Sequence, residues 1–283
     1  MAEDRERLEG VTPQQLIDTP DLIAAGVAGD EVRRRMHGTK TTFNRVFEVH
    51  VDAPPAALPA GVSAGEFRIV GKPSSLDALT AAVRATAALA GEVPVTVFSV
   101  FDLLALPQSI RVIAAAIKEA GVSALVHLPI DRVENAELVA QDVRAADLAI
   151  LSIGVDDLDD NHRLALCEMA STLQSRAGGF RAFAPLPRKM SVTKPTTGYD
   201  DVRMVALARV VAQNIESIQV DWALYGPKLA QVALTVGAND LDNVAAEDPG
   251  VLGTRRSPLE EIKRNITAAS LKPAERDGLF NPQ

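Results

Sequence analysis

Short apolar segments typical of buried strands alternate with longer segments of helical pattern along most of the chain. The predicted strands are residues 43–52, 95–100, 124–128, 148–153, 180–184 and 218–222, and a helical segment follows nearly every one. Parallel strands need such crossover helices, so this alternation is typical of a parallel sheet covered by helices. In a chain of 283 residues it predicts an α/β fold, namely a partial or distorted TIM-like (β/α) barrel with about six parallel strands. A doubly wound sheet is the alternative.

The positions of proline and glycine suggest three parts within one domain. Residues 1–42 are predicted to form an N-terminal helical segment, residues 43–250 the barrel, and residues 251–283 a C-terminal helix and tail. Parallel α/β architectures bind their ligands where the strands end. We therefore expect the chemistry of this chain at the carboxyl ends of its strands.

Charge and cysteine content exclude several classes of partner and cofactor. The 29 Lys and Arg residues against 37 Asp and Glu give a net charge of −8, and no basic stripe is present, so we expect no nucleic-acid partner. No stretch reaches the ~20 uncharged apolar residues of a membrane helix. The charged start MAEDRERLEG lacks the apolar core of a signal peptide. A single cysteine, Cys167, permits neither an internal disulfide nor a cysteine-based metal centre, and we expect a cytoplasmic protein without membrane insertion.

Polar side chains occupy one face of the first predicted strand. The candidate catalytic residues are Glu48, His50 and Asp52 on that face and His127 near the end of the third strand. The alternation of side chains in a strand places this polar face toward the barrel interior. Burial of such groups is costly unless they are paired, hydrated or bound to a cation. Three interpretations stay open: a divalent metal held by Glu48, His50 and Asp52, a polar lumen that binds a ligand, or a structural network that includes Arg45.

A second group of acidic and amide side chains lies near the end of the chain. The predicted sixth strand ends in Asp221-Trp222, and Asn239, Asp240, Asp242 and Glu247 follow a predicted helix stop at Gly237. Such a cluster in a loop at a strand end can bind a cation or the hydroxyl groups of a ribose. It is equally typical of ordinary loop residues and helix caps.

Three segments resemble aminofutalosine synthase, a radical S-adenosylmethionine enzyme of the futalosine route to menaquinone. They are DEVRRRMHGTKTTFNR, the stretch KPTTGYDDVRMVALARVVAQNIESIQVDWALYGPKLAQVALTVGANDLDNVAAED, and SPLEEIKRNITAASLKPAERDGLF. Cyclic dehypoxanthine futalosine synthase and the enzymes of deazaflavin cofactor assembly are similar. The resemblance covers about the first 45 and the last 105 residues, and it implies a radical S-adenosylmethionine type of barrel.

The chain departs from that family at the position of its iron–sulfur cluster. The family places a C-x3-C-x2-C motif directly after the first strand, where this chain has Asp52-Ala53-Pro54-Pro55-Ala56-Ala57-Leu58-Pro59. Without three thiolates we expect no ordinary cluster, and without the cluster there is no electron for the adenosyl radical. The glycine-rich signature that contacts the methionyl amine is also missing after VTVFSVFDLL. We therefore expect neither an iron–sulfur cluster nor the family's mode of S-adenosylmethionine binding.

The resemblance also implies a set of ligand-binding residues. In the family, this end of the barrel helps to enclose a nucleoside-like product with a benzoate moiety. The matching residues are Pro185, Leu186, Pro187, Thr193, Asp221, Trp222, Asn239, Asp240, Asp242 and Glu247, with Arg45 added from the first strand. Where the family has an aromatic residue and a proline, this chain has Arg188-Lys189-Met190, whose two positive charges suit a carboxylate.

Three hypotheses about function follow. The first is a cluster-less homologue that binds a futalosine-like metabolite of menaquinone biosynthesis or serves as an accessory subunit. The second is a repurposed barrel enzyme in which Glu48, His50, Asp52 and His127 perform metal-assisted or acid–base chemistry. The third is a scaffold within a hetero-oligomer. The expected partners are a small, nucleoside-like or carboxylate-bearing molecule and further subunits of a homo- or hetero-oligomer.

Overall fold

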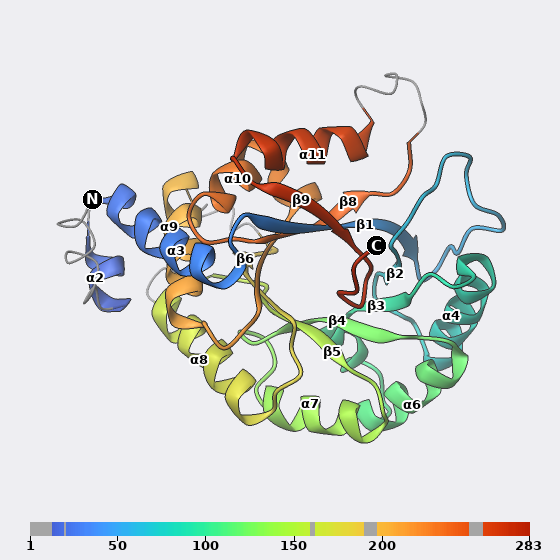
Figure 1. Cartoon of the computed structure of the whole chain (residues 1–283). Coiled ribbons are helices and arrows are strands. Elements are labelled where there is room, and N and C mark those ends of the chain that lie inside the picture. Colours follow the sequence, from blue (N-terminus) through green and yellow to red (C-terminus); the bar gives the residue numbers. More distant parts are fainter. Residues whose placement is uncertain (1–12, 20, 159–161, 190–196, 249–256) are drawn as a thin grey trace.

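A computed structural model describes residues 13–19, 21–158, 162–189, 197–248 and 257–283 (Figure 1). Eight parallel strands form the centre of the molecule. They are β1 (Lys40–His50), β2 (Glu66–Val70), β3 (Val95–Ser99), β4 (Ala124–Pro129), β5 (Ile150–Val155), β6 (Ala182–Pro187), β7 (Ser217–Asp221) and β8 (Asp240–Ala245). Because β1 pairs with both β2 and β8, the sheet closes into a complete barrel. The prediction of a TIM-like α/β barrel is confirmed, but the expected six strands and a partial barrel are wrong.

Helices surround the barrel, as Figure 1 shows. They are α2 (Pro13–Asp18), α3 (Leu22–His37), α4 (Leu76–Ala90), α5 (Val100–Leu103), α6 (Ile110–Ala120), α7 (Ala136–Ala145), α8 (Arg163–Arg176), α9 (Gly198–Val211), α10 (Trp222–Leu234) and α11 (Pro258–Ala268). The sequence encodes several of their ends. In α6, for example, the Ser109 side chain accepts a hydrogen bond from the Val112 N–H, and Gly121 ends the helix in a left-handed conformation. No helix among the described residues has the length and apolar character needed to cross a membrane.

A ninth strand, β9 (Lys272–Arg276), completes the sheet beside β1. Residues 40–44 of β1 pair with β9, and residues 46–50 pair with β2, so β9 fills the space next to the first half of β1. The chain then turns, and the Phe280 ring lies 3.9 Å from the guanidinium carbon of Arg276. The C-terminal segment thereby closes the barrel at the amino ends of its strands.

The inside of the barrel holds ion pairs where many such barrels hold layers of aliphatic side chains. Arg68 donates to both oxygens of Glu66 and both oxygens of Asp242, at 2.7–3.0 Å. Arg276 donates to both oxygens of Asp240, at 2.6 and 2.7 Å. Burial would raise the pKa of Asp242, but the charges of Arg68 and Arg276 outweigh it and lower that pKa to about 2. This network ties β2, β8 and β9 together across the interior.

Candidate functional site at the carboxyl end of the barrel

Charged and aromatic side chains from several strands meet at the carboxyl end of the barrel. His127 comes from β4, Arg188 directly follows β6, and Asp221 ends β7. Phe98, from β3, connects two of these groups. Its ring stacks on the His127 imidazole with a centroid distance of 5.0 Å and an angle of 7°, and the Arg188 guanidinium carbon lies 4.3 Å from the Phe98 centroid. Histidine, aromatic ring and guanidinium therefore form one packed group.

His127 is bound to a carboxylate that directly follows β5. Its Nε2 lies 3.0 Å from Oδ1 of Asp156, and both residues are buried. Burial lowers the pKa of His127 against the effect of the Asp156 hydrogen bond, and the positive charge of Arg188 lowers it further. Burial alone would raise the pKa of Asp156, but the His127 hydrogen bond and nearby positive charges bring it below its ordinary value. The pair therefore combines a neutral imidazole with an ionised carboxylate near pH 7.

The His127 ring occupies space that only a glycine leaves open. A Cβ atom on Gly154 of β5 would lie 1.9 Å from Cε1 of His127, far inside van der Waals contact. The imidazole thus packs against bare backbone. A glycine at this position is required for the His127–Asp156 arrangement.

Asp221 connects three elements at the carboxyl end. Its Oδ1 accepts from the Leu224 N–H at 2.9 Å, which caps α10, and its Oδ2 accepts from Nη1 of Arg188 at 2.8 Å. Asn243 on β8 donates to the same Oδ2 at 3.5 Å and to Oε1 of Glu48 at 3.2 Å. Asn243 has a φ of 60°, a left-handed conformation that asparagine tolerates better than most residues. Asp221 and Asn243 therefore join β6, β7, β8 and β1 at this end.

A cleft of about 560 Å³ opens beside these residues. It is lined on one side by β1 and the end of β8, and on the other by the first turns of α10 and α11. Its walls carry the indole of Trp222, the amide of Asn243 and the exposed carboxylates of Glu48 and Glu247. Four segments that are far apart in the sequence thus form one concave surface.

The polar face of β1 differs from the expectation. Glu48, His50 and Asp52 are all exposed at the rim, so their predicted burial is wrong. Nδ1 of His50 lies 3.7 Å from Oδ2 of Asp52, and the two side chains are 56% and 61% exposed. Among the described residues, no group of three or more His, Cys, Asp or Glu side chains is placed to hold a metal ion. These three side chains are therefore solvated at the rim and need no bound cation to offset a cost of burial.

The predicted ligand residues near the end of the chain fall into separate places. The segment after Gly237, which was expected to be a loop, forms strand β8. Its acidic side chains can lie inside the barrel because they pair with buried arginines. Asp240 and Asp242 belong to the ion-pair network, and Asn239 lies at the opposite end of the barrel, where it accepts from Arg209. Asp221, Trp222 and Glu247 lie at the carboxyl end. Arg45 pairs with Glu275 of β9 at 2.6 Å, and Thr193 lies outside the described residues.

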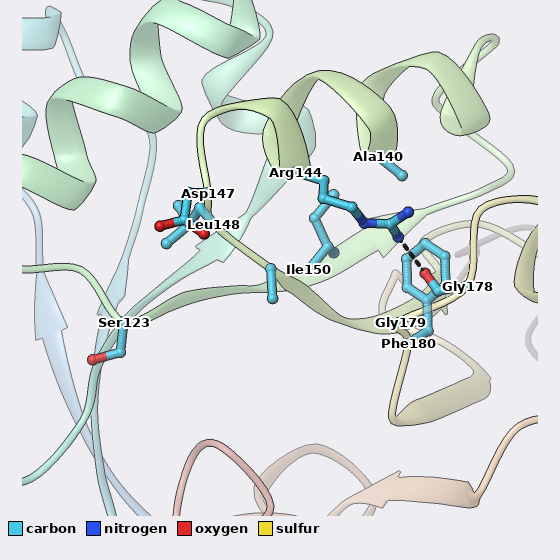
Figure 2. Close-up of a pocket in the computed structure, with 10 residues that line it drawn as sticks. Ser123, Ala140, Arg144, Asp147, Leu148, Ile150, Gly178, Gly179 and Phe180 are labelled. Carbon is cyan, nitrogen blue, oxygen red and sulfur yellow. Dashed lines mark hydrogen bonds between the residues drawn. The ribbon is translucent and has the colours of Figure 1, made fainter.

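A second pocket, of about 320 Å³, lies at the amino ends of β5 and β6 (Figure 2). Arg144 is its basic residue, and Figure 2 shows its side chain directed to the Gly178 carbonyl, to which it donates at 2.7 Å. In barrels of this kind the amino end serves stability and the carboxyl end serves function. This pocket is therefore part of the scaffold.

The residues directly after β1, where the family that this sequence resembles holds an iron–sulfur cluster, do not fit one. The segment directly after β1, residues 51–59, has no cysteine, and the single cysteine of the sequence, Cys167, lies completely buried in α8. Burial raises the pKa of the Cys167 thiol far above its ordinary value, so the thiolate that a metal needs is disfavoured. We therefore assign no chemistry of this chain to such a cluster.

Sequence reasoning did not identify Phe98 or Asp156 as site residues. Asp156 had an available signal, since it directly follows the apolar strand sequence LSIGV and therefore lies at the carboxyl edge of the sheet. Phe98 had none, because a phenylalanine in a strand is an ordinary core residue. Its role appears only through the contacts with His127 and Arg188.

Comparison with known proteins identifies relatives of the C-terminal part. Residues 179–283 match the family model of the CofH/MqnC C-terminal region. Over 133 residues the chain is 34% identical to 5-amino-6-(D-ribitylamino)uracil–L-tyrosine 4-hydroxyphenyl transferase of Archaeoglobus fulgidus, covering 42% of this chain and 38% of that protein. Identity to aminodeoxyfutalosine synthase of Thermus thermophilus is also 34% over 133 residues, covering 42% and 36%. For cyclic dehypoxanthine futalosine synthase of Streptomyces coelicolor it is 34% over 122 residues, covering 40% and 31%. The alignments thus span 31–38% of the length of these relatives.

Solved structures extend the likeness to the whole fold. The FeFe-hydrogenase maturase HydG from Carboxydothermus hydrogenoformans superposes with a TM-score of 0.67 at 11% identity, covering 99% of this chain and 80% of that one. Methylornithine synthase superposes with a TM-score of 0.63 at 12% identity, covering 94% and 96%. At such identities the likeness concerns the fold alone, a parallel α/β barrel. Residues 179–283 are thus similar to the C-terminal region of the CofH/MqnC proteins, and about two fifths of the chain is similar to the two futalosine synthases.

Proposed function

We propose that this chain binds a futalosine-like metabolite, a ring that carries a sugar or polyol chain, at the carboxyl end of its barrel without radical chemistry. It does so on its own or as an accessory subunit of an enzyme that holds a cluster. The segment directly after β1 has no cysteine, and this supports the absence of radical chemistry, since a radical S-adenosylmethionine enzyme needs three thiolates there to hold its cluster. The names of the three relatives support the binding of such a metabolite, because each name contains a ribityl or futalosine group.

The cleft beside Trp222 is the observation that carries the proposal. An indole offers a flat apolar surface for a ring, and carboxylate and amide oxygens accept hydrogen bonds from sugar hydroxyls. The cleft brings an indole, an amide and two carboxylates together in a volume that suits a small ligand. These groups belong to Trp222, Asn243, Glu48 and Glu247. The ligand would lie across β1, β8 and the start of α10.

Intrinsic fluorescence tests this proposal at one defined position, because Trp222 is the only tryptophan of the sequence. The full chain is titrated with aminodeoxyfutalosine, cyclic dehypoxanthine futalosine and 5-amino-6-(D-ribitylamino)uracil. We expect a saturable change of Trp222 emission with at least one of them, and a matching binding heat. The variant Glu48→Gln should bind more weakly. Absence of both emission change and heat with all three compounds would refute the proposal.

Acid–base catalysis is a second candidate function, favoured by the His127–Asp156 pair. A neutral imidazole oriented by a carboxylate is a common form of general base. Here the pair lies where β4 and β5 end, next to Arg188. Turnover of any of the three compounds, lost in His127→Gln while binding persists, would favour this second function over binding alone.

A further inference from the structure

We propose that Arg188 and Lys189 form a subsite for one carboxylate group of the ligand. This inference rests on the proposed function, since it assigns a chemical group of the same ligand to a defined place at the carboxyl end of the barrel. Neither residue belongs to the cleft beside Trp222. The subsite therefore extends the binding surface toward β5 and β6.

The backbone holds both residues in fixed positions. The Arg188 N–H donates to the Val155 carbonyl at 3.1 Å, and the Lys189 N–H donates to the Asp156 carbonyl at 2.8 Å. These bonds continue the pairing of β5 with β6 beyond the last strand residue, Pro187. Both side chains thus leave from an ordered edge of the sheet, which lowers the entropic cost of binding a ligand.

Arg188 differs from Arg68 and Arg276, the two arginines of the barrel interior, in its unused donors. Arg68 and Arg276 are buried, and each guanidinium donates to both oxygens of at least one carboxylate. The Arg188 side chain is 29% exposed. Among the described residues, its one hydrogen bond runs from Nη1 to Asp221. Toward the part of the chain that the structure describes, four of the five N–H groups of this guanidinium therefore make no hydrogen bond.

Contacts on Arg188 also fix how those donors are presented. The Phe98 ring packs 4.3 Å from the guanidinium carbon, and Asp221 holds one nitrogen. A planar guanidinium held in this way offers its free edge to a planar anion, and carboxylates bind such an edge through two parallel hydrogen bonds. The geometry is that of a preorganised carboxylate receptor.

Charge balance selects a singly charged group. Lys189 is 56% exposed, and its Nζ lies 3.8 Å from Oδ2 of Asp156, too far for a hydrogen bond. Two cations, Arg188 and Lys189, thus face two carboxylates, Asp221 and Asp156, so the four groups together carry no net charge. A carboxylate adds one negative charge, whereas a phosphate adds up to two and meets more repulsion from Asp156 and Asp221.

The test uses benzoate as the carboxylate probe and benzamide as its neutral isostere. Calorimetric titration of the full chain should show that benzoate binds and that benzamide binds at least about tenfold more weakly. Arg188→Gln should weaken benzoate binding by about tenfold or more, and Arg188→Lys should give a smaller loss. The matched control is Arg111→Gln on α6, whose side chain is 60% exposed and pairs with Asp142 outside the barrel. It should leave benzoate affinity unchanged.

The subsite is overturned if the native chain binds no benzoate, if benzamide binds equally well, if inorganic phosphate binds more tightly than benzoate, or if Arg188→Gln has no effect. Its failure is separable from that of the proposed function, because 5-amino-6-(D-ribitylamino)uracil has no carboxylate.

Discussion

At the scale of single residues, His127 makes the stability of the fold dependent on pH. Burial lowers its pKa below the ordinary value of 6.5, so in weak acid the unfolded chain binds a proton that the folded chain does not. The free energy of unfolding should therefore fall as the pH drops below about 6.5.

Replacement of this imidazole should flatten that dependence. Urea denaturation of the native chain and of His127→Gln between pH 7.5 and 5.0 measures it, and the native chain should lose more stability than the variant over this range. His37, whose pKa is also lowered by burial, is present in both chains and cancels in the difference. Equal slopes would show that His127 does not titrate as described.

Gly154 and His127 should be energetically coupled. Gly154→Ala places a methyl group within 1.9 Å of the imidazole carbon, and relief of this clash should cost about 1–3 kcal/mol of unfolding free energy. In a His127→Ala background the same substitution should cost clearly less, because the obstructing ring is gone. Urea denaturation of the four chains gives the coupling energy. The same cost in both backgrounds would contradict the packing described.

Residue types alone could not separate the functional from the structural acids. Asp221 and Asp242 are both acidic residues at strand positions, yet one lies at the rim and the other inside an ion-pair network. The role of each carboxylate depends on which arginine lies beside it. The register between strands that are distant in the sequence decides which arginine that is. The prediction that Asp221 and Trp222 lie where strands end is confirmed.

At the scale of elements, the strands that the sequence did not reveal are those that carry buried ions. Three strands contribute charged side chains to the interior. These side chains are Glu66 and Arg68 from β2, Asp240 and Asp242 from β8, and Arg276 from β9. A strand with charged inward residues lacks the apolar pattern by which strands are recognised. Strands β3 to β7 are predictable from the sequence because their residues are mostly apolar.

β9 should stabilise the barrel strongly through Arg276. Its guanidinium holds Asp240, which is 0% exposed and would otherwise remain a buried charge with fewer partners. Arg276→Met should cost about 3–5 kcal/mol of unfolding free energy, because breaking one side of a buried ion pair leaves the other uncompensated. Urea denaturation measures this cost, with Lys272→Met on the exposed start of β9 as the control. A loss below about 1 kcal/mol would show that the pair adds little.

At the scale of the whole molecule, the likeness in fold extends further than the likeness in sequence. The barrel superposes on a known barrel over 99% of its length, while the alignment at 34% identity covers 42% of the chain. The residues after β1 that would define radical chemistry carry no thiol. The barrel instead presents Arg188, Asp221, His127 and the cleft beside Trp222 at its carboxyl end. These are the features on which we base the proposal of a binding protein without radical chemistry.

Anaerobic reconstitution with iron and sulfide, followed by reduction and addition of S-adenosylmethionine, tests the central claim most directly. We expect no charge-transfer absorption near 400 nm and no release of 5′-deoxyadenosine above the level of a Cys167→Ala control. Aminodeoxyfutalosine synthase of Thermus thermophilus, treated in parallel, serves as the positive control. A brown protein that binds stoichiometric iron and cleaves S-adenosylmethionine would contradict this account.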